Sequence, residues 1–273
     1  MPRRHALTAA IATAAAATLA FAPAASAERF VAADNNDRLY TFDDSRPGKV
    51  KRTKPLKGLS PGDRIVGLDV RPANGQLVAL TQSSRLYNVD PATATAAMIG
   101  PGPFEPGLNG LASGFDFNPT VDRIRLVSNG GQNLRLNPDT GTIAFTDTVL
   151  NYKDGDPGAG VAPVLAGSAY TNSVAGATST TLYNIDSGRD TLVIQDPPND
   201  GILTTVGALG VNLAGPVSFD ISPTTGKAFV LARRARSTVA RLYDINLGTG
   251  AARQIGIVRR TPNLVAFASL STP

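Results

Sequence analysis

The sequence predicts an all-β fold, a β-propeller of five blades with about four antiparallel strands each. Short runs of alternating apolar and polar residues are broken every few positions by Asn, Pro, Asp and Gly, which is typical of an antiparallel meander. One layout recurs at a near-constant spacing through most of the chain. The two ends of the repeat region are incomplete in complementary ways, so that together they make one blade.

The stretch from Gly114 to Gly141, GFDFNPTVDRIRLVSNGGQNLRLNPDTG, shows the layout of one blade. Its third strand matches segments that end at Asp43, Asp90, Asn137, Asp186 and Asn246, with spacings of 47, 47, 49 and 60 residues. Its first strand matches segments that place Asp69, Asp116, Ala169, Asp220 and Ala266 in one position, with spacings of 47, 53, 51 and 46. Both alignments give five repeats, which supports five blades.

The ends of the chain predict how the ring closes. RFVAADNNDRLYTFDDSRPGKVKRT supplies second, third and fourth strands, whereas NLVAFASL near the C-terminus is a first strand with nothing after it. A ring in which the C-terminal strand joins the N-terminal blade leaves no open sheet edge. The fourth blade is less regular: only 12 residues separate Ala169 from Leu182, so its second strand should be short or rearranged. Asn151–Pro163 and Asp196–Gly215 interrupt the spacing and are candidate binding loops.

The first 27 residues have the features of a signal peptide. Arg3 and Arg4 form a basic start, an uncharged run extends from Ala6 to Ala22, and Ala25-Ser26-Ala27 suits cleavage by a signal peptidase. We therefore expect residues 1–27 to be a signal peptide, residues 28–273 to be a single propeller domain, and the protein to be secreted or extracytoplasmic. The Arg pair is also compatible with the twin-arginine route.

Composition excludes several classes of function. Cleavage after Ala27 leaves 246 residues with a net charge of +3, which is not the balance of a nucleic-acid-binding protein, and no later apolar segment could span a membrane. The chain has no Cys, and its only His is His5 in the signal segment. Ser-His and Cys-His nucleophile pairs and His-based zinc or copper sites are thereby excluded. Glu28 and Glu105 are the only Glu residues, so acid-base pairs would have to use Asp.

Asp69, Asp116 and Asp220 occupy the same position on three of the five predicted inner strands. They could point into the central channel and hold a cation or polar ligand, because carboxylates converging from several strands suit a hard metal such as calcium. Alternatively, each could be a structural acid that accepts hydrogen bonds from its own following turn. A position that repeats favours a repeated structural role, so the sequence favours the second interpretation. Asp69, Asp116, Asn118 and Asp220 are the candidate channel residues. We expect no cofactor, with calcium as the alternative if the acids hold a ligand.

Three segments carry a resemblance to a known family: GFDFNPTVDRIRLVSNGGQNLRLNPDTG, AYTNSVAGATSTTLYNID and QDPPNDGILTTVGALG. They resemble the hallmark segments of a bacterial family of exported proteins catalogued only as a domain of unknown function. The similarity covers nearly all of the mature chain and implies a secreted or surface protein, with no catalytic residues to transfer. More loosely, the blade layout is similar to YVTN-type and quinoprotein-like propeller repeats, and this second similarity concerns the fold alone.

The sequence favours a non-catalytic, exported propeller that binds a cell-envelope component or a protein partner, and we expect it to be a monomer. The competing hypothesis is an enzyme. A lactonase-like propeller would need a divalent cation at Asp69, Asp116 and Asp220, with a partner such as Asn118. A five-bladed glycosidase would need Glu105 at the channel as its acid. A purely structural module that spaces other envelope parts is a third alternative.

Overall fold

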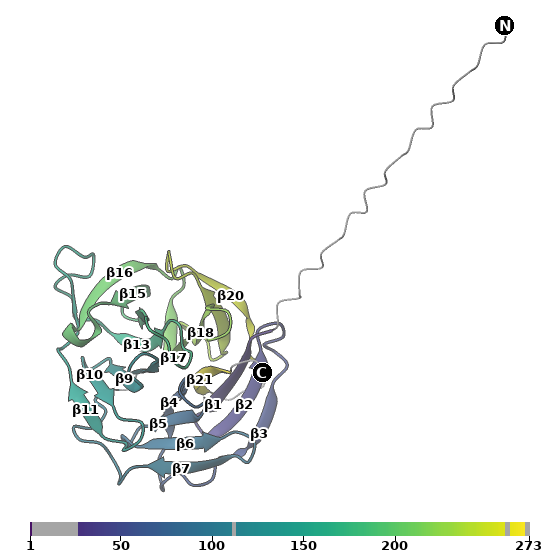
Figure 1. The fold of residues 1–273 in the computed structure, drawn as a ribbon, viewed down its shortest axis with the longest axis vertical. Helices are drawn as coiled ribbons and strands as arrows, with labels where there is room; N and C mark the ends of the chain where they lie inside the picture. The colour runs from purple at the N-terminus through teal and green to yellow at the C-terminus, as the bar shows by residue number, and fades with distance from the viewer. Residues whose placement is uncertain (2–26, 111–112, 260–262, 271–273) are drawn as a thin grey trace.

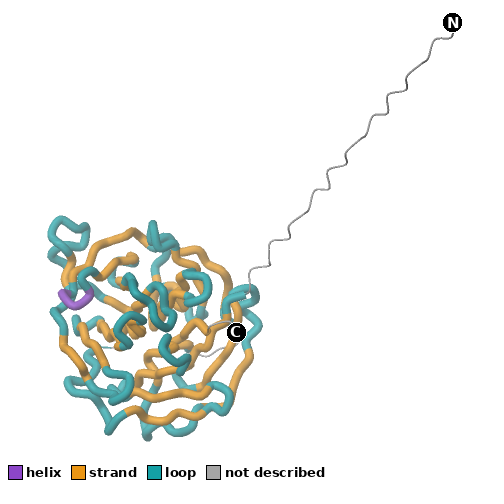
Figure 2. The backbone as a smooth tube through the Cα atoms, viewed as in Figure 1, coloured by secondary structure: helices purple, strands orange, loops and turns teal. Residues whose placement is uncertain are grey.

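The computed structural model describes Met1 and residues 27–110, 113–259 and 263–270, so residues 2–26 of the predicted signal peptide lie outside the described residues. Five small antiparallel sheets stand around a central axis (Figure 1). Nearly all regular structure is strand, joined by short turns (Figure 2). The predicted five-bladed β-propeller is confirmed. Among the described residues, no helix combines the length and apolar character needed to cross a membrane.

Each blade contains four antiparallel strands that pair with their neighbours in sequence, except where the ring closes, and blade 4 carries one further strand that pairs parallel to its outermost strand. From the inner to the outer strand, blade 1 contains β21 (Leu264–Leu270), β1 (Arg29–Asp34), β2 (Arg38–Asp43) and β3 (Lys51–Pro55); blade 2 contains β4 (Ile65–Val70), β5 (Leu77–Thr81), β6 (Leu86–Asp90) and β7 (Thr95–Ile99); and blade 3 contains β8 (Ser113–Asn118), β9 (Arg123–Ser128), β10 (Asn133–Leu136) and β11 (Ile143–Thr146). Blade 4 contains β13 (Leu165–Tyr170), β14 (Leu182–Asp186), β15 (Thr191–Gln195) and β16 (Ile202–Ala208), with β12 (Asn151–Tyr152) at its outer edge; and blade 5 contains β17 (Leu213–Ile221), β18 (Ala228–Arg234), β19 (Arg241–Ile245) and β20 (Ala252–Ile257).

The C-terminal strand closes the ring as predicted. Strand β21 pairs antiparallel with β1, so one blade is built from both ends of the domain. Polar contacts also join the start of blade 1 to blade 5, because the buried Glu28 carboxylate accepts hydrogen bonds from the hydroxyls of Ser222 (2.7 Å) and Thr225. Within blade 1, the Glu28 amide donates to Asp44 (2.9 Å). Sheet pairing therefore joins the two ends, and side chains fix the first of them to the neighbouring blade.

The inner strands approach one another closely because each has a small residue two positions before the repeated position that Asp69, Asp116 and Asp220 occupy. A Cβ atom on Gly67 of β4 would lie 2.9 Å from Phe115 of β8, and one on Gly167 of β13 would lie 2.8 Å from Phe219 of β17. Blade 5 has Ser218 in this position. Because the strands lie so close together, the side chains at the repeated position can reach the inner strand of the neighbouring blade.

The core lies between the blades rather than at the centre of the ring. Four interfaces between blades each bury eleven to fourteen hydrophobic residues, whereas the interface between blades 3 and 4 buries six. A buried polar network fills the rest of that interface. Arg125 donates to Asn133 (2.6 Å), Asp147 (2.7 Å) and Asn199 (2.8 Å), and Arg135 also pairs with Asp147.

Blade 4 differs from the sequence prediction. The segment TLYNID, aligned above with third strands, contains the second strand β14, and β15 is the third. The alignment was wrong here because neighbouring strands of a meander share the same alternation, so the pattern does not tell a second strand from a third. Much of Asp196–Gly215 is strand β16 together with the short 3-10 helix η1 (Pro198–Asp200). Asn151–Pro163 begins with β12, which pairs parallel to β16.

Candidate functional site

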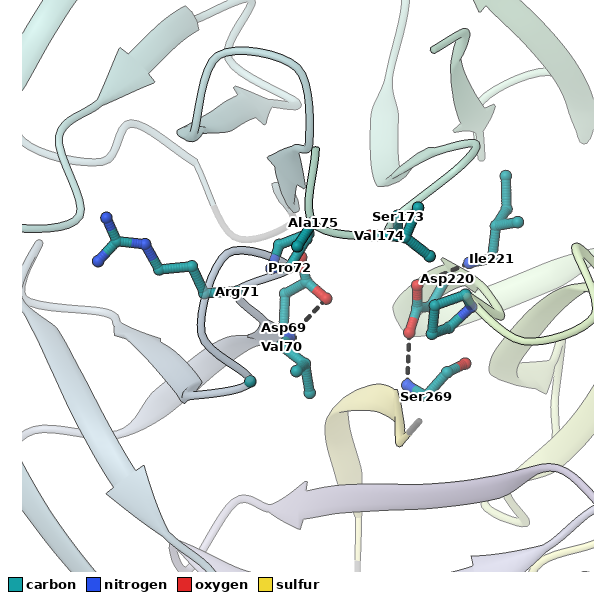
Figure 3. Close-up of a pocket in the computed structure, with 12 residues that line it drawn as sticks. Asp69, Val70, Arg71, Pro72, Ser173, Val174, Ala175, Asp220, Ile221 and Ser269 are labelled. Atoms are coloured by element: carbon teal, nitrogen blue, oxygen red, sulfur yellow. Dashed lines mark hydrogen bonds between the residues drawn. The ribbon is translucent and has the colours of Figure 1, made fainter. Parts of the chain in front are cut away.

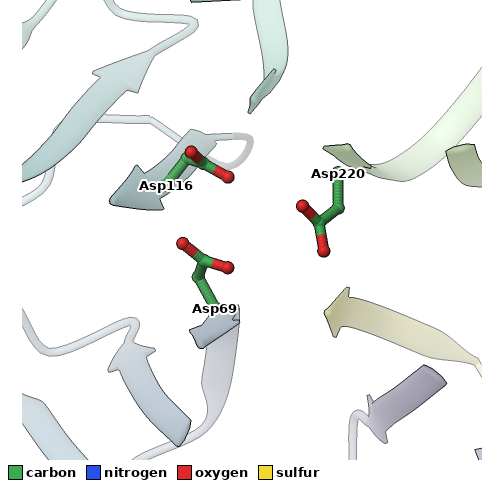
Figure 4. Close-up of side chains that lie close together, drawn as sticks. All are labelled: Asp69, Asp116 and Asp220. Carbon is green, nitrogen blue, oxygen red and sulfur yellow. The ribbon is translucent and has the colours of Figure 1, made fainter. Parts of the chain in front are cut away.

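Three predicted channel residues meet at the centre of the ring. Asp69 of β4, Asp116 of β8 and Asp220 of β17 each contribute a carboxylate oxygen, and these oxygens lie within 4.8 Å of one another (Figure 4). All three residues are buried, with 4%, 2% and 6% of their surface exposed. Because they occupy the same position of three inner strands, the propeller symmetry itself points them toward the axis.

Each acid also ties its blade to the next. Its carboxylate accepts a hydrogen bond from a backbone amide on the inner strand of the neighbouring blade. The three pairs are Asp69 with the amide of Phe117 (2.7 Å), Asp116 with that of Tyr170 (2.9 Å), and Asp220 with that of Ser269. These bonds satisfy inner-strand amides that face the channel, where no further strand could pair with them.

Two blades lack an acid at this position. The neighbour-to-neighbour bonds identify the equivalent residues as Ala169 in blade 4 and Ala268 in blade 1, so the sequence alignment on Ala266 was wrong by two residues. The amides that these blades leave without a partner, those of Val70 and Ile221, bond instead to the acids of their own strands at 2.7 and 2.6 Å. Three carboxylates thus serve five amides around the ring.

These contacts alter the two interpretations drawn from the sequence. The acids have a structural role, but its bonds run mainly between blades and not to each acid's own turn. At the same time the carboxylates converge on one point, which the alternative of a ligand site requires. The two roles are compatible, because a carboxylate has about four acceptor sites on its two oxygens.

The cluster carries no compensating positive charge. In the part of the chain that the structure describes, no ion pair involves any of the three carboxylates. Burial raises the pKa of Asp69 and Asp116 well above the usual range, and each feels the charge of its neighbours in the cluster. Burial also raises the pKa of Asp220 to about 6, although the Ser269 amide opposes the shift. Without a bound cation, the cluster therefore holds protons more strongly than ordinary Asp residues do.

A cavity of about 170 Å³ opens beside the acids at one mouth of the channel (Figure 3). We call this side the first-turn face, because it carries the turns between the first and second strands of the blades. Asp69, Asp220 and Ser269 line the cavity, and the loop tip at Ser173–Ala175 lies across it. Arg71 also lines it, but its guanidinium points away and pairs with Asp122 and, at 2.7 Å, with Asp139.

The loop over the cavity belongs to blade 4, where β13 and β14 are joined by residues 171–181. Its base is closed by hydrogen bonds from the Thr171 amide to the Thr181 carbonyl (3.0 Å) and from the Thr181 amide to the Thr171 hydroxyl (2.8 Å). Val174 near its tip is 45% exposed. Blade 4, the irregular blade of the sequence analysis, thus provides a cover for the channel mouth.

Ser269 is a site residue that the sequence analysis missed. It is 2% exposed, and its hydroxyl has no hydrogen-bond partner of regular geometry within the described residues. The hydroxyl nevertheless lies close enough to the Asp220 carboxylate to lower the pKa of that acid. The sequence could have pointed to it. The residue directly after the repeated channel position is Val70, Phe117, Tyr170, Ile221 or Ser269 in the five blades. A small hydroxyl residue is unusual in a set that is otherwise apolar or aromatic.

Two other candidates lie elsewhere. The side-chain oxygen of Asn118 accepts hydrogen bonds from the amide (2.9 Å) and hydroxyl (2.7 Å) of Thr120, so Asn118 caps the turn after β8. Glu105 is exposed and lies beside the β5–β6 turn, where the Phe104 amide bonds to the Ser84 carbonyl (2.9 Å). That turn is at the opposite end of blade 2 from Asp69, so the glycosidase alternative loses Glu105, the acid on which it depended.

The fold and the site define a five-bladed β-propeller with an acid-lined channel mouth. The chain belongs to the family described as Domain of unknown function (DUF4394), whose model matches residues 38–268. The expected family resemblance is therefore confirmed. No curated protein matches the sequence.

Solved structures resemble the chain in fold. A chain of the nidogen/laminin complex aligns with a TM-score of 0.51 at 10% identity, over 90% of this chain and 98% of that one. Hydrazine synthase of Kuenenia stuttgartiensis gives 0.42 at 13%, over 79% and 54%. PorZ, a bacterial surface component of the type-IX secretion system of Porphyromonas gingivalis, gives 0.40 at 14%, over 80% and 26%. The chain thus spans about half and a quarter of the last two.

Proposed function

We propose that the protein is an exported, non-catalytic propeller that binds a cell-envelope component or protein partner at the first-turn face. The observation that carries this proposal is the cavity at the channel mouth, with uncompensated acids at its base and the Ser173–Ala175 loop across it. Its acidic base favours a ligand that brings positive charge, as an amine or a metal ion does. Because residues 28–273 contain no His and no Cys, the common nucleophile pairs are absent.

Site-specific photo-crosslinking in cells tests this proposal. A benzophenone amino acid replaces Val174, which is 45% exposed beside the cavity, or Val161, which is 51% exposed in the segment between β12 and β13. We expect a discrete adduct from position 174 of the extracytoplasmic protein and none from position 161. Equal adducts from both positions, adducts from neither, or retention of the protein in the cytoplasm would contradict the proposal.

A metal-dependent hydrolase is the second candidate, because the three carboxylates converge as a lactonase-like site would require. Hydrolysis of simple lactones and aryl esters, followed at constant pH with and without calcium, tests it. Turnover that requires calcium and disappears in Asp116→Asn would favour the enzyme over the binding protein. Absence of turnover in a calcium-loaded protein would leave the binding function.

A further inference from the structure

We propose that Asp69, Asp116, Asp220 and the Ser269 hydroxyl form a site for a divalent cation of the calcium class. The inference deepens the proposed function and rests on it, because it concerns the same channel mouth and names what holds the ligand there. Oxygen ligands alone, from carboxylates and a hydroxyl, suit hard cations such as calcium and magnesium, whereas thiolate and imidazole sites select other metals.

The spacing of the carboxylates favours calcium over magnesium. Three oxygens no more than 4.8 Å apart lie at most about 2.8 Å from a common centre. Calcium binds oxygen at 2.3–2.6 Å in flexible geometry, whereas magnesium requires 2.0–2.1 Å and a near-ideal octahedron. A shift of a few tenths of an ångström per side chain would suffice for calcium. Magnesium would need a larger contraction of three strands held in a closed ring.

Ser269 is independent evidence for a ligand. Ser269 lines the same cavity, and its buried hydroxyl has no hydrogen-bond partner of regular geometry within the described residues, although it lies within reach of the Asp220 carboxylate. Buried hydroxyls normally find a partner, and leaving one without a partner has a free-energy cost. A cation between the carboxylates would give this oxygen a ligand role.

The structural hydrogen bonds leave room for a cation. Asp69 and Asp220 each accept two backbone amides, one on each oxygen, and a single amide bond is recorded for Asp116. A carboxylate oxygen has two lone pairs, so an oxygen that accepts one amide can still bind a metal. The amide bonds would also fix the carboxylates in place before the cation arrives.

The cavity supplies the remaining ligands. Calcium takes six to eight oxygens, and the four residues named above offer fewer than that. A water molecule occupies about 30 Å³ in the liquid, so a cavity of about 170 Å³ has space for several. Oxygen atoms of a bound partner could replace these waters, which would couple the cation to the ligand of the proposed function.

Calorimetric titration of the purified protein, first stripped with EDTA, tests the cation site directly. We expect one calcium per chain with a Kd on the order of 0.1–1 mM, as in extracellular modules, and weaker binding of magnesium. Asp69→Asn and Asp116→Asn should each weaken calcium binding by about 10-fold or more. Ser269→Ala should weaken it by a smaller factor. The matched control is Asp90→Asn, an exposed acid of the same blade as Asp69 that should bind calcium normally.

Thermal unfolding gives a second readout on the same proteins. At a calcium concentration one hundred times the wild-type Kd, the Tm should rise by about 5–10 °C, and this shift should fall to about half or less in Asp116→Asn. A folded protein that gives neither heat nor a Tm shift with 10 mM calcium would overturn the cation site. So would binding that survives both Asp substitutions. Neither result depends on the crosslinking, so partner binding could persist after the cation site has failed.

Discussion

Two polar clusters in this propeller differ in whether their charges are balanced. At the face of blade 3 toward blade 4, Arg125 and Arg135 both pair with Asp147, at 2.7 and 2.8 Å. Neutral groups accept the other hydrogen bonds of Arg125, and they belong to Asn133, Asn199 and Tyr170. In the channel, three carboxylates face one another, and within the part of the chain that the structure describes their hydrogen-bond donors are backbone amides, with the Ser269 hydroxyl beside Asp220. Arg125 and Asn133 of the first cluster and all three acids of the second are buried.

The difference indicates which cluster is complete. In the first cluster, ion pairs within blade 3 balance the charge, and the bonds from Arg125 to Asn199 and from Gln195 to Asn133 join blade 3 to blade 4 where the hydrophobic contact is smallest. The channel cluster has negative charge that nothing in the described chain neutralises. Protons or a bound cation must supply the missing positive charge. A buried cluster whose charges are balanced therefore indicates a structural role, whereas a buried cluster with excess negative charge indicates a binding site.

The largest effect should come from breaking the complete cluster. Arg125→Leu leaves the buried Asp147 with only the partly exposed Arg135, and it also removes the donors to Asn133 and Asn199. We expect a loss of about 3–5 kcal/mol in the free energy of unfolding, measured in urea, with calcium binding unchanged in the folded protein. Arg253→Leu is the control: it breaks an exposed ion pair with Asp244 and should cost less than about 1 kcal/mol. Equal losses in the two variants would refute the comparison.

A substitution in the channel cluster should have the opposite sign when no cation is present. Asp116→Asn keeps an oxygen for the Tyr170 amide, removes one charge and offers an amide donor to the two remaining carboxylates. In EDTA at pH 7.5 we expect the variant to be more stable than the wild type by roughly 1–3 kcal/mol in urea unfolding. Calcium at one hundred times the wild-type Kd should narrow or reverse this difference, because the wild type gains more from binding than the variant does. A variant less stable than the wild type in EDTA would contradict this account.

The same cluster predicts an unusual pH dependence. The folded-state pKa of Asp220 is about 6, against about 3.9 when unfolded, so between these values the folded protein binds more protons. In EDTA, the free energy of unfolding should therefore rise by roughly 1–2 kcal/mol as the pH falls from 7.5 to 5. Acids whose pKa is lowered, such as Asp139 and Asp156, lose their contribution only below about pH 4. Urea titrations at both pH values check this, and a fall in wild-type stability on acidification would count against it.

The sequence predicted those features of the fold and of the channel cluster that follow from its repeats. The five blades, the closure by the C-terminal strand and the shared position of Asp69, Asp116 and Asp220 all follow from repeats with a fixed spacing. The bonds from each acid to the next blade could not be predicted, because they depend on how closely inner strands approach in the closed ring. The network around Arg125 was missed for a related reason: Asp147 and Asn199 meet it from segments far apart in the sequence.

The smallest effect should come from a charged pair that is neither buried nor in the channel. Asp139 shares Arg71 with Asp122 at the first-turn face, and its side chain is 64% exposed. The Arg71 guanidinium lowers the pKa of Asp139, but solvent screens the pair, and Asp122 remains as a partner when Asp139 is lost. Asp139→Asn should therefore cost less than about 1 kcal/mol in urea unfolding and leave the calcium titration unchanged. A loss in the free energy of unfolding close to that of Arg125→Leu would show that burial does not decide how much an ion pair contributes to stability. A loss of calcium binding would extend the site to the Arg71 side of the cavity and place its centre away from the channel axis.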